Sequence, residues 1–70
     1  MNGLKSLRER RLLTQGELAA AAGVGVATVS RVETGKVRPS LRTIRALAGP
    51  LGLSAEALHT VLLSRQQALL

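Results

Sequence analysis

Apolar residues recur along this 70-residue chain at three- and four-residue spacings, which is typical of amphipathic α-helices. The pattern predicts an all-α fold, and its length suits one small domain covering residues 1–70. Short polar or glycine-containing segments separate the apolar stripes. We therefore expect five helices, at about residues 3–12, 15–22, 26–34, 41–49 and 55–68.

The two helices at 15–22 and 26–34 are predicted to form a helix-turn-helix. Their inward-facing positions are the apolar residues at helical spacing: Leu18, Ala19, Ala22, Val29 and Val32. Gly23 stands between them, where a left-handed residue closes a helix, and Gly35 ends the second helix. The pair is too small to bury itself, so other helices must cover one side. The second helix can then face outward, in the position that fits a DNA major groove.

Residues that cap helices mark the expected starts. Thr14 with Glu17 three residues later forms the pattern of a capping box, so a helix should begin directly after Thr14. Ser40 and Ser54 are the expected N-caps of the last two helices. Gly25 is a weaker N-cap for the helix at 26–34, because it has no side chain to accept a hydrogen bond.

One arginine in the first helix is expected to face the core. Leu4 and Leu7 share a face with either Arg8 or Arg11, and the spacing leaves both alternatives open. A buried guanidinium is costly unless a carboxylate meets it. Glu33 is the natural candidate for that carboxylate.

Pro50 conflicts with its surroundings. It removes a backbone donor and clashes with the preceding turn, and Gly49 weakens the same place. We expect the regular helix to end near residue 48 or 49, or to kink there. The apolar stripe of this segment is Ile44, Leu47, Ala48 and Leu51, and that of the last helix is Leu58, Val61, Leu62, Arg65 and Leu69.

The charge balance favours a polyanionic partner. Ten Lys and Arg residues face four acidic residues, a formal net charge of +6 and a sequence pI near 11.8. Simple solubility and an anionic membrane surface are the alternative explanations of such an excess. The chain contains no Phe, Trp or Tyr, which argues against binding of single-stranded nucleic acid by base stacking. Duplex DNA that is read through its grooves needs no aromatic rings.

Other kinds of site have little support in the sequence. His59 is the one histidine and there is no cysteine, so we expect no metal site, no disulfide and no cofactor. No cluster of serine, histidine and acidic residues suggests catalysis, and we expect no enzyme. No stretch approaches the roughly 20 apolar residues of a membrane span. We expect a cytoplasmic protein.

Several segments in register resemble the helix-turn-helix domain of the XRE/Cro-type (lambda repressor-like) phage and bacterial repressors. The similarity covers about residues 4–58 and is carried by these fragments in order: LKSLRERRLLTQGELA, AGV, TVSRVETGKVRPS and LRTIRALAGPLGLS. Each fragment alone is unspecific, but their order and spacing together are specific. The resemblance implies a five-helix fold in which the second and third helices bind DNA.

The resemblance also implies roles for individual residues. The base-contacting positions would be Val26, Ala27, Thr28, Ser30 and Arg31. The phosphate-contacting positions would be Gln15, Lys36, Arg38 and Arg42. Exposed surface residues with no DNA role are the alternative reading of both sets. Arg8 and Glu33 match a pair that forms a partly buried ion pair between helices one and three.

Three positions depart from the family pattern. Val26 and Ala27 are apolar where relatives often carry polar residues, so they could pack on a thymine methyl group or add little sequence information. Leu12 stands where relatives often have the glycine that ends the first helix, which would lengthen that helix or strain its exit. Pro50 interrupts a helix that is usually continuous.

The sequence favours one function over two others. The first hypothesis is a sequence-specific DNA-binding transcriptional regulator, a repressor that binds a palindromic operator as a homodimer. Leu62, Leu63, Leu69 and Leu70 supply more apolar surface near the C-terminus than one stripe can hide, which suggests a dimer surface there. An antitoxin-like or adaptor module that binds a partner protein is the main alternative. An amphipathic membrane-surface binder is the weakest alternative.

Overall fold

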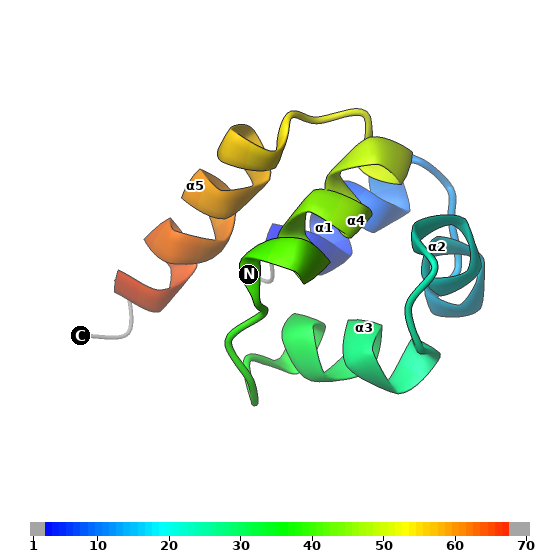
Figure 1. Cartoon of the computed structure of the whole chain (residues 1–70), viewed down its shortest axis with the longest axis horizontal. Coiled ribbons are helices and arrows are strands. Elements are labelled where there is room, and N and C mark those ends of the chain that lie inside the picture. The colour runs from blue at the N-terminus through cyan, green and yellow to red at the C-terminus, as the bar shows by residue number, and fades with distance from the viewer. Residues whose placement is uncertain (1–2, 68–70) are drawn as a thin grey trace.

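The computed structural model describes the backbone of residues 3–67 and the side chains of residues 3–62. Figure 1 shows the arrangement of its helices. They are α1 (Gly3–Arg10), α2 (Gln15–Ala22), α3 (Val26–Thr34), α4 (Leu41–Leu51) and α5 (Ala55–Gln67). The described residues contain no strand, and the predicted all-α, lambda repressor-like fold is confirmed.

The core is built from contributions of every helix. Helix α2 packs against α3 and α4, α4 packs against α5, and α1 packs against α3 and α5. In Figure 1, α2 lies at one end of the molecule and α5 at the other, α4 and α1 lie between them, and α3 runs along the lower side. Each helix supplies one fully buried side chain, in chain order Leu4, Leu18, Val29, Leu47 and Leu58. Loss of any one helix therefore exposes part of the same core.

The predicted caps hold the helix-turn-helix together. The Thr14 hydroxyl accepts from the Glu17 amide at 3.0 Å, and the Glu17 carboxylate accepts from the Thr14 amide at 2.8 Å. Gly23 closes α2 in the left-handed region with φ of 72°, and its cap bonds reach Ala19 and Ala20. This reciprocal capping fixes where α2 begins, and the glycine fixes the direction in which the chain leaves it.

Leu12 strains the exit from α1. The helix ends at Arg10 instead of continuing to residue 12, and Leu12 adopts a φ of 58°. Of the two alternatives for this departure, the structure shows strain at the exit and no lengthening of the helix. The Leu12 side chain is 90% exposed, so no packing compensates for a conformation that L residues with a Cβ rarely adopt.

Helix α4 passes through Pro50, which corrects the expectation that it ends near residue 48 or 49. It continues to Leu51 and closes at Gly52, whose φ is 73°. Pro50 lies in the last turn of α4, where it removes the backbone donor of one helical hydrogen bond. Burial of Leu51 and a hydrogen bond from Arg11 Nε to the Leu51 carbonyl, at 3.1 Å, hold the helix end in place.

Helix α5 is buried along the first half of its predicted stripe. Leu58 and Leu62 are buried, and Val61 is half-buried. The Ser54 hydroxyl accepts from the Ala57 amide at 3.0 Å, as expected for an N-cap. Side chains of Leu63, Arg65, Leu69 and Leu70 lie outside the described residues. None of the described helices has the length and hydropathy needed to cross a membrane.

Replacing Leu12 with glycine should stabilise the protein. Glycine adopts a positive φ without the steric cost of a Cβ, so we expect Leu12→Gly to raise the free energy of unfolding by about 1 kcal/mol. Urea denaturation followed by circular dichroism measures this change. Leu12→Ala is the matched control, because it removes the exposed side chain but keeps the Cβ. Equal stabilisation by both variants would show that backbone strain is not the cause.

Candidate nucleic-acid interface

Helix α3 turns one face to the core and the other to solvent. Val29 and Val32 are buried on the inner face. On the outer face Val26 is 51% exposed, and Ala27 and Arg31 are also exposed. The two remaining predicted base-contacting residues, Thr28 and Ser30, are half-buried. The inward valines fix the rotation of α3 about its axis, so the five predicted residues are accessible together along its first turns.

The N-terminus of α3 is left open by its cap. Gly25 is the N-cap with an extended backbone, and no side chain accepts hydrogen bonds from the first turn of the helix. Unpaired amide groups and the positive end of the helix dipole therefore lie beside Val26 and Ala27. This combination attracts anions. A polar N-cap side chain would occupy the same amides, so glycine is chemically suited to an anion-facing helix start.

A cationic rim follows α3 directly. We use this name for Lys36, Arg38 and Arg42, all of which are exposed. Gly35 reverses the chain at the end of α3 with φ of 75°. Ser40 then starts α4 by accepting a hydrogen bond from the Thr43 amide at 3.2 Å. These two turns place the rim in the loop and the first turn of α4, next in the chain to the outer face of α3.

Gln15, a predicted phosphate contact, is also fixed by a hydrogen bond within the protein. It begins α2 and is half-buried, and its Nε2 donates to Glu33 Oε1 at 3.0 Å. The bond joins the start of α2 to α3. The second N–H of Nε2 and the backbone amide at the helix N-terminus remain the donors that suit contact with a phosphate.

Arg8 and Glu33 form a buried, two-pronged ion pair. Arg8 Nε donates to Glu33 Oε2 at 2.6 Å, and Nη2 donates to Oε1 at 3.2 Å. Both residues are buried, and Arg8 Nη1 also donates to the Leu13 carbonyl at 2.8 Å. The hydrogen bond to Glu33 raises the pKa of the Arg8 guanidinium, while desolvation acts in the opposite direction. Of the two arginines left open by the sequence, Arg8 is the buried one.

Two features of this region could not be read from residue spacing. The Gln15–Glu33 bond and the Arg8–Leu13 bond link segments that meet only in the folded chain. Arg11, which spacing also placed near the core, is exposed and instead caps the end of α4. The one sequence signal for these hydrogen bonds was the carboxylate of Glu33 on the inner face of α3, because a buried acid needs several hydrogen-bond donors.

Comparison with known proteins agrees with this geometry. A family model described as helix-turn-helix matches residues 4–58. The chain belongs to the XRE-type helix-turn-helix family. The resemblance drawn from the sequence fragments is thereby confirmed, and membership in this family agrees with the expectation that the chain is not an enzyme.

Curated relatives carry the names of repressors and regulators. The immunity repressor protein of Bacillus phage phi105 is 34% identical over 67 residues, which are 93% of this chain and 46% of that protein. The HTH-type transcriptional repressor RghR of Bacillus subtilis is 45% identical over 56 residues, 79% of this chain and 42% of RghR. The HTH-type transcriptional regulator DdrOP3 of Deinococcus deserti is 36% identical over 55 residues, 79% of this chain and 43% of DdrOP3. The chain therefore spans less than half the length of these relatives.

Removing one partner of the buried ion pair should damage the fold more than removing both. Arg8→Met or Glu33→Leu alone leaves a charge buried without its partner, and we expect each to lower the free energy of unfolding by about 3–5 kcal/mol. The double variant should lose clearly less than the sum, because neither charge remains. Urea denaturation of the four proteins gives the coupling energy. Additive losses would contradict the coupling.

Proposed function

We propose that this chain is a sequence-specific double-stranded DNA-binding transcriptional regulator, a repressor that binds a palindromic operator as a homodimer. The observation that carries the proposal is the exposed outer face of α3, with Arg31 on it and the exposed cationic rim directly after it in the chain. Val29 and Val32 hold the opposite face in the core, so α3 has a defined surface to place in a major groove. The names of the bacterial and phage relatives, which are those of repressors and a transcriptional regulator, support regulation of transcription.

Arg31 is the residue best suited to read a base. Its guanidinium can donate two hydrogen bonds to N7 and O6 of one guanine in the major groove. Val26 and Ala27 offer methyl groups to a thymine, while Thr28 and Ser30 offer hydroxyls to bases or phosphates. With so few polar side chains on this face, sequence-dependent DNA shape supplies the rest of the specificity.

Lys36, Arg38, Arg42 and Gln15 contact phosphates in this proposal. The first three are exposed cations, and Gln15 lies at the N-terminus of α2. Such contacts hold the protein on the duplex without reading sequence, and they release counterions, so affinity falls with salt. The basic residues between positions 31 and 45 thus orient α3 on the duplex, and the residues on its outer face determine which DNA sequence is bound.

A homodimer follows from how little DNA one copy can read. One recognition helix touches only a few base pairs, so two copies over half-sites about one helical turn apart give the selectivity that a regulator needs. Leu62, Leu63, Leu69 and Leu70 are the apolar residues near the C-terminus proposed for the dimer surface. Among them, the side chain of Leu62 is the one that the structure describes, and it is buried.

Loss of the Arg31 guanidinium should relax sequence selectivity. An operator is first selected from a random duplex library with the unmodified protein. We expect Arg31→Ala to lose about 1–3 kcal/mol of preference for that sequence over a version with the contacted guanine replaced. Competition gel shifts measure the preference.

Arg31→Lys is the control for charge in the same experiment. Lysine keeps the positive charge but lacks the two-pronged geometry of guanidinium. We expect its affinity for arbitrary duplex to stay near that of the unmodified protein while the preference falls. Full preference in both variants would show that Arg31 reads no base.

Removal of a rim charge should weaken binding to all duplexes alike. We expect Arg42→Gln to lower the slope of log affinity against log salt by about 1, because one fewer counterion is released. Fluorescence anisotropy at several salt concentrations measures the slope. Arg10→Gln is the charge-matched control, since Arg10 is exposed at the end of α1, outside the proposed DNA face. Equal slopes for the two variants would remove Arg42 from the phosphate contacts.

A further inference from the structure

The centre of the outer face of α3 carries an alanine and an arginine one helical turn apart. Val29 and Val32 mark the buried side of the helix. Because successive residues are rotated by about 100°, Ala27 and Arg31 point most directly away from that side, and both are exposed. Four residues advance a helix by about 6 Å, which is less than two base-pair steps of about 3.4 Å each. Ala27 therefore lies within two base pairs of the base that Arg31 contacts.

The first turn of this face is apolar. Val26 is the first residue of α3 and is 51% exposed, and Ala27 follows it. Neither side chain has a hydrogen-bond donor or acceptor, so neither can pair with the polar groups on a base edge. The apolar group that the major groove offers is the C5 methyl group of thymine. 5-Methylcytosine carries a methyl group at the same place, whereas cytosine and uracil carry a hydrogen there.

Nothing inside the fold requires glycine at position 25. The backbone of Gly25 has φ of −76° and ψ of 149°, an extended conformation open to any residue. Beyond its chain neighbours, a Cβ placed there would approach the Thr28 hydroxyl oxygen alone, at the ordinary contact distance of 3.9 Å. The missing side chain leaves space in front of the first turn of α3. The short side chains of Val26 and Ala27 can therefore reach a base edge.

We propose that Val26 and Ala27 recognise the C5 methyl group of a pyrimidine within two base pairs of the guanine bound by Arg31. Apolar side chains do not distinguish the O4 acceptor of thymine from the N4 donor of cytosine, so they accept thymine and 5-methylcytosine alike. Methylation of a cytosine at this position therefore converts a weak site into a stronger one. This inference rests on the DNA binding of the proposed function and names the chemical class of duplex that it selects.

Removal of single methyl groups from the operator tests the inference. An operator is first selected with the unmodified protein from a random library of ordinary duplex DNA. Each thymine of a half-site is then replaced in turn by uracil, which pairs as thymine does and lacks only the C5 methyl group. We expect replacement within two base pairs of the guanine read by Arg31 to weaken binding about fourfold, the effect of losing one methyl group from an apolar contact. Competition gel shifts measure this ratio.

Cytosine and 5-methylcytosine are then compared at the sensitive position. The thymine–adenine pair is replaced by a cytosine–guanine pair, with and without the C5 methyl group. Both duplexes present the same hydrogen-bonding groups, so the ratio of their affinities isolates the methyl group. We expect the methylated duplex to bind about fourfold more tightly.

Protein variants show whether the methyl group is contacted directly. Val26→Ser and Ala27→Gly remove methyl groups from the protein, and we expect the preference for thymine over uracil to fall to about 1 in the variant whose side chain faces that base. Ala20→Gly is the matched control, because it makes the same change at an exposed residue of α2 outside the proposed contacts. Its preference should stay about fourfold. Each variant is compared with itself on two duplexes, so a general loss of stability cancels. An effect of the methyl group on DNA stiffness alone would persist in every variant.

The remaining outcomes overturn the inference in distinguishable ways. Tolerance of uracil at every position, or a half-site without thymine near the guanine, refutes methyl recognition and leaves sequence-specific binding through Arg31 standing. A thymine preference that survives in both variants refutes the assignment to Val26 and Ala27. Failure to select any operator refutes the sequence-specific binding of the proposed function, and this inference falls with it.

Discussion

The buried contact between Arg8 and Glu33 is the constraint on which the arrangement of the helix-turn-helix depends. It joins α1 to α3 through two hydrogen bonds, and Gln15 adds the start of α2 to the same carboxylate. Arg8 also holds the Leu13 carbonyl, in the turn that leads into α2. Glu33 therefore accepts from two helices while Val29 and Val32 of the same helix pack into the core. The orientation of α3 is set by polar and apolar contacts together.

A small core makes such contacts important. A chain of this size buries a modest share of its unfolded surface, and within residues 3–62 the fully buried side chains number one from each helix. Interactions at the helix ends also fix the conformation of the chain. They are the capping box at Thr14, the left-handed glycines, and the hydrogen bond from Arg11 to the end of α4. The strain at Leu12 and the proline in α4 are tolerated because both lie at or near a helix end.

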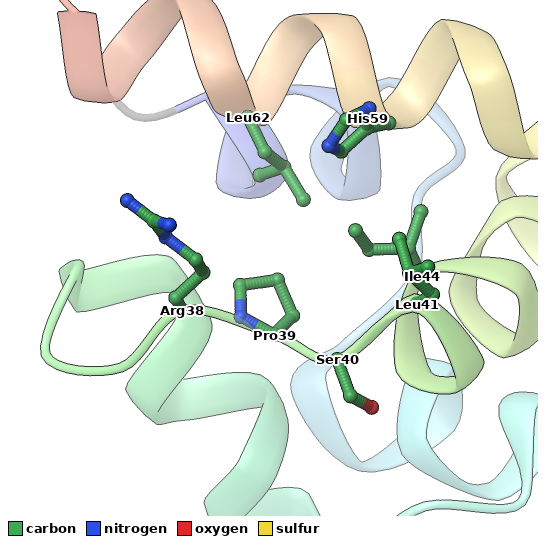
Figure 2. Close-up of a pocket in the computed structure, with 7 residues that line it drawn as sticks. All are labelled: Arg38, Pro39, Ser40, Leu41, Ile44, His59 and Leu62. Atoms are coloured by element: carbon green, nitrogen blue, oxygen red, sulfur yellow. The ribbon is translucent and has the colours of Figure 1, made fainter.

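The surface carries two chemically different regions. The outer face of α3 and the cationic rim carry exposed cations and open helix amides, which suit the phosphates and base edges proposed as their contacts. The hollow between α4 and α5 combines apolar walls with one acid, Glu56, and two cations, Arg38 and Arg45. Arg38 belongs to both regions, because it is part of the cationic rim and also lines this hollow (Figure 2).

Sequence alone determined the local elements, because their signals lie within a few residues. The apolar stripes, the Thr14 cap and the glycine ends located α2 and α3 as observed, and Ser40 located the start of α4. The need of a buried arginine for a carboxylate identified Glu33. Only the tertiary structure decided between Arg8 and Arg11, linked Gln15 to Glu33, and kept Pro50 inside α4. Those outcomes depend on which segments meet across the core. Contacts between residues far apart in the sequence produce no periodic pattern of apolar residues, so the sequence does not reveal them. The hollow lined by Leu41, Ile44 and His59 also could not be predicted from the sequence, because its walls come from α4 and α5 and the packing of these helices creates it.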